Sequence, residues 1–572
     1  MINWIKKYWL EILVFGIVFA ILMIDLNPDF TFMNKAADSI GYIYSALYLY
    51  PAYHTSAPLF LILGHFFLKL PIGTDAWRFG LLSVFATMGT CVFVYLILRN
   101  LLKNKMWAIL GVFLTGTSAL ILSQSIIVET YPLVCLCATG AYYFAMKKKW
   151  YWVAVCLGAG CAIHLLGFIV AAVFFFGYKE YRKNWRALLL TVAFGLFYLY
   201  IPIRDKAAPA MWLPKNTNAV WAVISDTYSV IKMLVGTISI WDIPKRIMDT
   251  VGILGVSVGG VLAIPIIYYL TRNKAWKTVI FWLIVLPVVL FISELDMNTF
   301  DYTMLAVPFL IIIGILGLNM LVEKHRADLS ESPVYIPVSK ILVICVVISA
   351  VVFAGYNLNY FDIGRTLDPH MSAAELMEVE YPKLPSNAIF MPTWGWEWEG
   401  IYLYNKEYNE NIIPVSEDML NSASYRDSLE AEGINIEVSN NSNLSVAAKL
   451  MAQSIIALND NVWTTVTTDP YTFGAKVVEA NHDISLVSLP SEALIQKNAV
   501  DPQWKIIPYS PYRIMDTSIF ETQWGYVILS NKNMLLIVEC GVGGWMLYWI
   551  PYRLNERRKN RKEKRNETKE SK

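Results

Sequence analysis

The sequence predicts a polytopic α-helical membrane protein that carries an α/β domain outside the membrane. The chain of 572 residues is 56% hydrophobic and only 16% charged, which is more apolar than an ordinary soluble domain. Apolar runs of about 20 residues, the length that crosses a bilayer core, recur along it. One long polar segment, from 358 to 531, interrupts them near the C-terminus.

The apolar runs predict about twelve transmembrane helices. They lie near residues 8–25, 77–99, 106–123, 131–147, 151–164, 166–178, 186–203, 250–271, 277–293, 302–322, 339–357 and 532–550. The first run follows Lys6 and Lys7, and no small-residue cleavage site precedes Asp25. We therefore interpret it as a retained helix rather than a signal peptide.

Basic residues are concentrated in alternate loops, as the positive-inside rule requires of cytoplasmic loops. The basic loops are 99–105, 147–149, 178–186, 271–277 and 323–326, together with the tail. On this count the three long segments 25–76, 204–249 and 358–531 lie on the opposite, external side.

This topology divides the chain into four parts. They are a transmembrane domain (1–357) with the external loops 25–76 and 204–249, an extracytoplasmic α/β domain (358–531), a C-terminal helix (532–552) and a basic cytoplasmic tail (553–572). We interpret the tail as a topology anchor that touches anionic lipid, and we expect no nucleic-acid partner.

The external segment 358–531 has strand-like runs at 387–394, 411–416 and 483–489 and a helical run at 445–459. Its 23 acidic and nine basic residues give it a net charge of about −14. All seven cysteines lie in apolar runs elsewhere, so a disulfide framework or a cysteine-based zinc site is excluded for this domain.

Ionisable residues in apolar helices are costly unless they are paired or hydrated, so each one marks a candidate site. Five places stand out, all near the external face. They are Asp38 with His54, then Glu129, His164, Arg204, and finally Glu294, Asp296 and Asp301 with Tyr302. Singly, each is at least as well explained as a paired structural residue. Together they predict a hydrated pocket at the outer leaflet.

Two shorter apolar stretches, 54–71 and 218–240, are predicted to be interfacial helices that flank this pocket and form walls for a lipid chain. Pro58 suits the first turn of the former.

Several short motifs follow one another along the chain. In order they are Asp38-Ser39, the segment His54–Leu59, Trp77–Ser83 (WRFGLLS), Glu129–Leu133 (ETYPL), His164 at a helix end, Tyr198–Arg204 (YLYIPIR) and 381–394 (YPKLPSNAIFMPTW). Their order resembles that of the GT-C superfamily of integral-membrane glycosyltransferases. The branch most similar is the O-mannosyltransferase-like family, which includes the animal transmembrane enzyme acting on IPT domains and bacterial relatives. The chain departs from that pattern at Gly41, where the family has Glu, at Thr55–Ala57 and at Gly80.

The resemblance implies a polyprenyl-phosphate-linked sugar, mannose or a similar hexose, as the donor. The acceptor would be an extracytoplasmic protein hydroxyl or an envelope glycan, reached from a prokaryotic cell membrane, and no cofactor is implied. A guanidinium suits the donor phosphate, so Arg204 is the first candidate and Arg78 the second. Asp38 is the candidate general base, in an inverting, metal-independent reaction. A divalent ion between Asp38 and Asp301 stays open. The remaining candidates for substrate contact are His54, Glu129, Tyr131, His164, Asp301 and Tyr302.

Three alternatives remain. A lipid-linked-sugar transporter or flippase would show internal repeats or paired broken helices, and we find no repeat. A non-catalytic GT-C-like scaffold is suggested by Gly41. An oligosaccharyltransferase is suggested by TWGWEWEG at 393–400, which only loosely resembles the W-W-D-Y-G signature of that class.

Overall fold

A computed structural model describes most of the N-terminal half of the chain and parts of the rest. The described residues are 2–26, 36–49, 57–102, 104–200, 203, 254, 257–258, 260–273, 278–293, 300–329, 347–348, 350–351, 354–355, 389–391, 413–414, 462–466, 476–481 and 484–489. The predicted segments 218–240, 445–459, 532–550 and the tail 553–572 lie outside them, as does the motif at 393–400.

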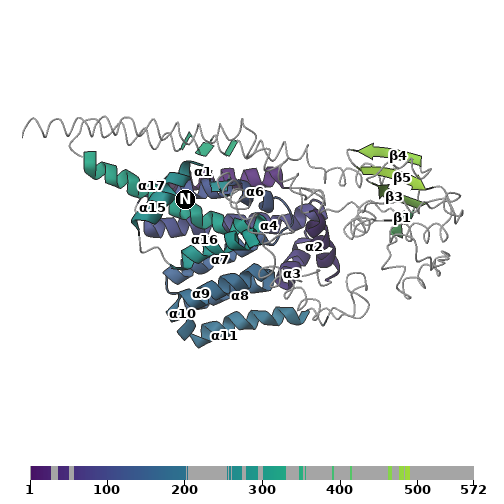
Figure 1. Ribbon diagram of the computed structural model, residues 1–572, viewed down its shortest axis with the longest axis horizontal. Coiled ribbons are helices and arrows are strands. Elements are labelled where there is room, and N and C mark those ends of the chain that lie inside the picture. The colour runs from purple at the N-terminus through teal and green to yellow at the C-terminus, as the bar shows by residue number, and fades with distance from the viewer. Residues whose placement is uncertain are drawn as a thin grey trace, which may run out of the picture.

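Helices, most of them apolar, lie side by side in the described part of the chain up to residue 329 (Figure 1). They are α1 (Ile2–Asp25), α2 (Ala36–Tyr48), α3 (Pro58–Phe67), α4 (Asp75–Leu101), α5 (Lys105–Gly116), α6 (Ala119–Ser125), α7 (Tyr131–Met146), α8 (Trp150–Ile163), α9 (Leu165–Gly177), α10 (Lys179–Lys183), α11 (Trp185–Ala193), α15 (Gly260–Arg272), α16 (Thr278–Ser293) and α17 (Val307–Leu329), with the 3-10 helices η2 (Phe194–Leu199) and η4 (Phe300–Ala306).

The core lies between α4, α7 and α17. Tyr142 of α7 is 2% exposed and meets the fully buried Phe309 of α17 edge to face, with 5.9 Å between ring centroids. Gly111 of α5 lets Leu98 of α4 approach closely, because a β-carbon there would lie 2.3 Å from a Leu98 methyl group. Close packing of this kind holds helices together where lipid supplies no hydrophobic driving force.

Among the described residues, three helices are long and apolar enough to cross a membrane: Lys7–Ile24, Asp75–Leu101 and Tyr302–Lys324. A fourth is added if α5 and α6 count as one bent span. The apolar helices from α7 to η2 are shorter. The expected total of twelve spans stays a prediction.

The sequence pattern predicts one helix over 106–123, and this is wrong in one respect. The chain forms α5 and α6 instead, which are bent by 58° at a break after Gly116. Thr115 and Thr117 donate to the carbonyls of Gly111 and Phe113, four residues earlier. Hydroxyl bonds of this kind compete with the helix ladder and bend it.

Other differences are smaller. Helix α2 was not predicted. The expected helix 186–203 changes from α11 to the tighter η2 at Phe194, and the expected helix 302–322 begins earlier, as η4. The predicted helix start at Pro58 is confirmed, with proline in the first turn of α3.

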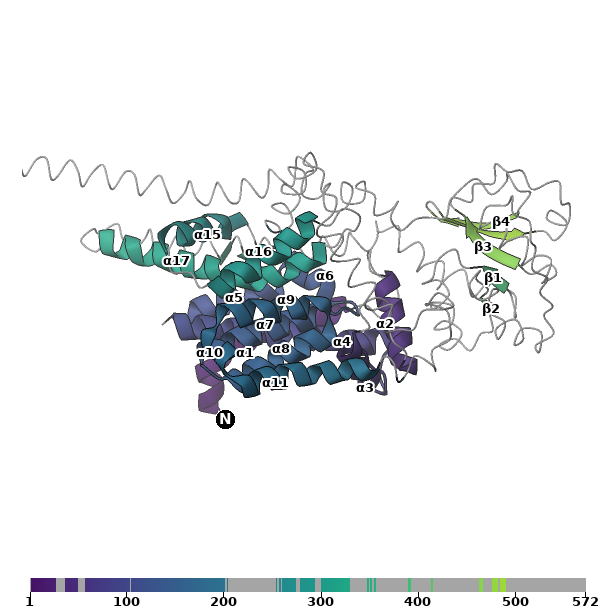
Figure 2. The same ribbon diagram turned by 60° about the horizontal axis from the view of Figure 1, so that its bottom comes forward.

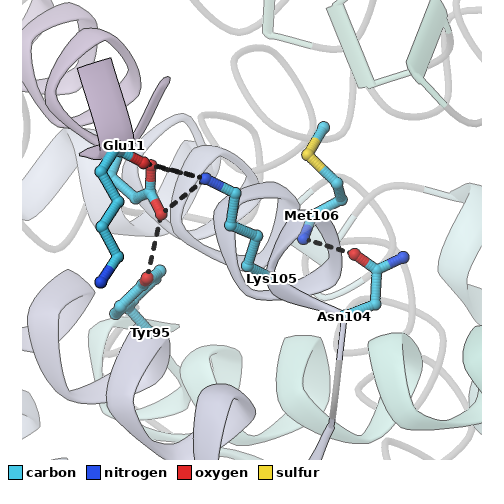
Figure 3. A network of polar contacts seen from close by, with 6 residues as sticks. Glu11, Tyr95, Asn104, Lys105 and Met106 are labelled. Carbon is cyan, nitrogen blue, oxygen red and sulfur yellow. Dashed lines mark hydrogen bonds and ion pairs between the residues drawn. The ribbon is translucent and has the colours of Figure 1, made fainter. Parts of the chain in front are cut away.

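A polar network ties the first helix to α4 and α5 (Figure 3). The carboxylate of Glu11, 8% exposed, accepts from Lys105 Nζ at 3.3 and 3.4 Å and from the Tyr95 hydroxyl at 3.4 Å. Asn104 caps α5 by accepting from the Met106 amide at 2.9 Å. The pair lies beside the basic loop 99–105, so a buried carboxylate is neutralised where the topology expects positive charge.

The described strands form one mixed sheet in the order β2-β1-β3-β5-β4. They are β1 (Ile389–Met391), β2 (Ile413–Pro414), β3 (Val462–Val466), β4 (Lys476–Asn481) and β5 (Ile484–Leu489). β1 pairs in parallel with β2 and β3, whereas β3, β5 and β4 pair antiparallel. The predictions of β1, β2 and β5 are confirmed; β3 and β4 were not predicted.

The two ends of the helical body carry different elements. In both views α2 and α3, from the first predicted external loop, lie at the end opposite α10, which belongs to a predicted cytoplasmic loop (Figures 1 and 2). The strands lie beyond the end that α2 occupies. This separation agrees with the predicted topology, while the side of the membrane that each end faces stays a prediction.

Candidate functional site

The centre of the candidate site is a non-helical turn, residues 126–130, between α6 and α7. All five residues are buried, with exposed fractions from 0 to 4%. Irregular backbone at membrane depth needs partners for its polar groups, and two serines from other helices provide them. Ser39 of α2 donates to the Val128 carbonyl at 3.1 Å, and Ser83 of α4 bonds the backbone of Glu129.

The Glu129 side chain folds onto the beginning of α7. Its Oε2 accepts from the Thr130 amide at 2.6 Å and from the Thr130 hydroxyl at 3.3 Å. The residue is 1% exposed. A carboxylate at this position is stabilised by the partial positive charge of the helix N-terminus, so the protein can hold an acidic group here away from water.

Three rings meet next to this turn. Tyr131, the first residue of α7, lies 5.2 Å from the His164 ring and 5.8 Å from that of Tyr302 in η4, measured between ring centroids. His164 and Tyr302 are 6.2 Å apart. Three of the five predicted places therefore come together: an imidazole and two phenols form one ring cluster, and Glu129 lies two residues before Tyr131 in the chain.

His164 lies at the break between α8 and α9, in an extended conformation (φ −157°, ψ 155°). Its Nδ1 accepts from the Leu166 amide at 3.1 Å and so caps α9. Because Nδ1 accepts, the proton of the neutral ring is on Nε2. Immediately around the break, Gly160 and Gly167 touch: a β-carbon on Gly167 would lie 2.1 Å from the Gly160 carbonyl.

The predicted phosphate-binding motif Tyr198–Arg204 begins next to the same break. The Tyr198 hydroxyl donates to the Cys161 carbonyl at 2.8 Å. That carbonyl is in the last turn of α8, where intrahelical partners are lacking. The end of η2 is thereby attached beside His164, but Arg204 itself lies outside the described residues.

The remaining candidates are placed in part. The backbone of Asp38 lies in α2, directly before Ser39, and that of Asp301 lies in η4 directly before Tyr302. The side chains of both, and the whole of His54, Glu294 and Asp296, lie outside the described part of the chain.

Arg78 is engaged within its own surroundings. Its Nε and one terminal nitrogen donate to the carbonyls of Thr74 (3.2 Å) and Leu70 (2.8 Å), and the other terminal nitrogen bonds Asp75. These contacts close the turn that precedes α4. They favour a structural role, and the role of Arg78 in donor binding stays a prediction.

Sequence reasoning did not single out Ser39 and Ser83 as site residues. Both lie inside quoted motifs, Asp38-Ser39 and Trp77–Ser83, so a signal was present. Serine is common in loops and helices, however, and nothing local distinguishes a hydroxyl that bonds a distant backbone from one that bonds its own helix.

The arrangement of the helices is similar to that in solved structures of another protein. Two solved structures carry this likeness. Crystal structures of ArnT from Cupriavidus metallidurans match with TM-scores of 0.51 in the apo state and 0.52 when bound to undecaprenyl phosphate. The first match covers 85% of this chain and 99% of ArnT at 11% identity, the second 84% and 98% at 10%. At such identities the likeness establishes the fold alone.

A structure of the Archaeoglobus fulgidus oligosaccharyltransferase tethered to an acceptor peptide is also similar, with a TM-score of 0.45 and 12% identity over 82% of this chain and 71% of that one. No family model matches the sequence, and no curated protein matches it either.

Proposed function

We propose that the chain is a membrane glycosyltransferase that moves a sugar from a polyprenyl-phosphate donor to an extracytoplasmic acceptor. The observation that carries the proposal is the cluster of Tyr131, His164 and Tyr302 beside the buried turn that holds Glu129. A sugar needs hydrogen-bonding and stacking partners of these types. The fold, shared with an ArnT structure bound to undecaprenyl phosphate, supports a lipid-phosphate donor.

The mechanism that fits these residues is a single displacement. Asp38 takes the proton from an acceptor hydroxyl while the oxygen attacks the anomeric carbon. The bond from that carbon to the phosphate oxygen breaks, and the polyprenyl phosphate leaves with the electron pair, neutralised by Arg204. One displacement inverts the configuration. A mannosyl or similar hexosyl donor, and a protein hydroxyl or envelope glycan as acceptor, are the finer parts of the proposal.

The experiment uses the purified full-length protein in lipid with a panel of undecaprenyl-phosphate hexoses, and measures released undecaprenyl phosphate by mass spectrometry. Asp38→Asn should lower transfer by about 100-fold or more, because it removes a general base. Asp25→Asn, the same change at the end of the first helix, serves as the matched control and should transfer normally.

Two results would reject parts of this proposal. Full transfer by Asp38→Asn would exclude Asp38 as the base. No transfer by the wild type from any donor would reject the enzyme and favour the scaffold, or the transporter if the lipid-linked sugar crosses the bilayer intact.

A further inference from the structure

The buried turn 126–130 raises a question that the proposed function does not answer, namely what holds Glu129 in place. The turn lies between two helices, so the polar backbone groups of its middle residues lack the partners that a helix supplies. At its ends the Ile126 amide and the Thr130 carbonyl still bond the adjoining helices. Each buried backbone group needs a hydrogen bond.

One hydroxyl serves both backbone groups of Glu129. Ser83 Oγ donates to the Glu129 carbonyl at 3.1 Å and accepts from the Glu129 amide at 3.3 Å. Ser83 is fully buried in the interior of α4. Because Ser83 belongs to a long apolar helix, its two hydrogen bonds fix the position of the Glu129 backbone relative to the helix bundle.

A second hydroxyl joins the turn to α2. Ser39 is 5% exposed and donates to the Val128 carbonyl at 3.1 Å. Asp38 precedes it in the same helix, so this bond brings the backbone of Asp38 beside the residue that precedes Glu129. Within the turn, the Thr130 amide donates to Glu129 Oε2.

We propose that Ser83 and Ser39 are positioning residues that clamp the turn 126–130 and thereby set Glu129 relative to the start of α2, where Asp38 lies. This inference rests on the proposed function for its catalytic consequence, but the clamp itself is independent of it. The serines touch no substrate; they act through the backbone of the turn. A displacement of about 1 Å in a reacting group can cost 100-fold in rate, so the clamp has a measurable effect.

The kinetic test compares Ser83→Ala and Ser39→Ala with the wild type, using the donor that the wild type accepts. We expect kcat to fall by about 10- to 100-fold with the donor KM nearly unchanged, because geometry is lost rather than binding. Ser83→Thr and Ser39→Thr keep the hydroxyl and should restore most of the rate at one or both positions.

The matched control is Ser123→Ala. Ser123 is about as buried as the clamp serines, at 1% exposed, and lies in neighbouring α6. Its hydroxyl bonds only within its own helix: it donates to the Leu120 carbonyl at 3.0 Å and accepts from the Gln124 side chain at 3.5 Å. The same atom is removed without loosening the turn, so transfer should stay at the wild-type level.

The structural test is amide hydrogen exchange resolved to single residues, which needs no activity. The Glu129 amide should exchange slowly in the wild type and at least about 10-fold faster in Ser83→Ala, since its acceptor is gone. Ser123→Ala should leave that amide protected.

The outcomes separate the two proposals. Unchanged exchange at Glu129 in Ser83→Ala overturns the clamp. Faster exchange with unchanged kcat overturns the positioning role, as does failure of threonine to restore the rate at both positions. A wild type without transfer rejects the proposed function, and the exchange of the Glu129 amide then decides the clamp alone.

Discussion

At the scale of single residues, His164 shows how one side chain can serve the fold and the site at once. Its Nδ1 caps α9 while its ring meets Tyr131 and Tyr302. The sequence marks it as an ionisable residue in an apolar run and as part of the motif order, at a helix end. The sequence leaves two alternative roles for His164, a paired structural residue and a substrate ligand. The two are compatible, because they use different parts of the imidazole.

The two roles can be separated with two variants. His164→Ala removes both the cap and the ring and should lower stability by about 1 kcal/mol, the usual cost of a lost N-cap. His164→Asn keeps a good capping acceptor and should be nearly as stable as the wild type. Both should lose transfer. Thermal unfolding and released undecaprenyl phosphate are the measurements; an active His164→Asn would show that the ring is dispensable for transfer.

At the scale of elements, breaks in helices place the site residues. The α5–α6 bend is followed by the turn that carries Glu129, and the α8–α9 break carries His164. At the first bend Gly116 lies at the break, and Ser39 and Ser83 bond the backbone of the turn that follows α6. At the second break Gly160 and Gly167 touch, and Tyr198 bonds the released Cys161 carbonyl. In a straight helix those backbone amides and carbonyls would bond within the helix, and the side chains could not meet at a common point.

The contact at the second break can be tested with Gly167→Ala. The added β-carbon would lie 2.1 Å from the backbone carbonyl of Gly160, which cannot rotate away as a side chain would. The helices must separate, and we expect a loss of about 2 kcal/mol in the free energy of unfolding, with lower transfer. Gly16→Ala in α1, where nothing lies within 4 Å, is the control and should be neutral in the same thermal-unfolding assay.

At the scale of the whole molecule, the opposite placement of α3 and α10 gives the bundle two chemically different ends. The α10 end carries the basic residues of 178–186, and the α3 end adjoins the buried turn and its ring cluster. With the positive-inside rule, the α3 end is predicted to face the outside of the cell, as the proposed reaction requires.

Cysteine labelling of intact cells tests this orientation. Ile72, in the turn after α3, is 55% exposed, and Lys183 is an exposed residue of α10. A membrane-impermeant maleimide should label Ile72→Cys in intact cells and Lys183→Cys only after lysis. The unsubstituted chain, whose seven cysteines all lie in apolar runs, reports the background. The reverse pattern would invert the topology.

Much of the architecture can be predicted from the sequence, because runs of apolar residues and the distribution of Lys and Arg are local signals. They are sufficient for most described helices, for the first turn at Pro58 and for three of the five strands. The order of the motifs also resembles that of the GT-C superfamily. Neither signal distinguishes the O-mannosyltransferase-like branch from other branches. Membership of that branch stays a prediction.

Only the tertiary structure decided where the chain breaks and what meets there. The bend after Gly116 falls inside one continuous apolar run. The contact of Tyr131 with His164 and Tyr302, and the bonds from Ser39 and Ser83 to the turn, join residues that the helical pattern treats alike. Their sequence separations of 33 to 171 residues carry no periodic signal. Hydropathy determined that these helices form; packing determined which buried hydroxyls, rings and carboxylates share one place.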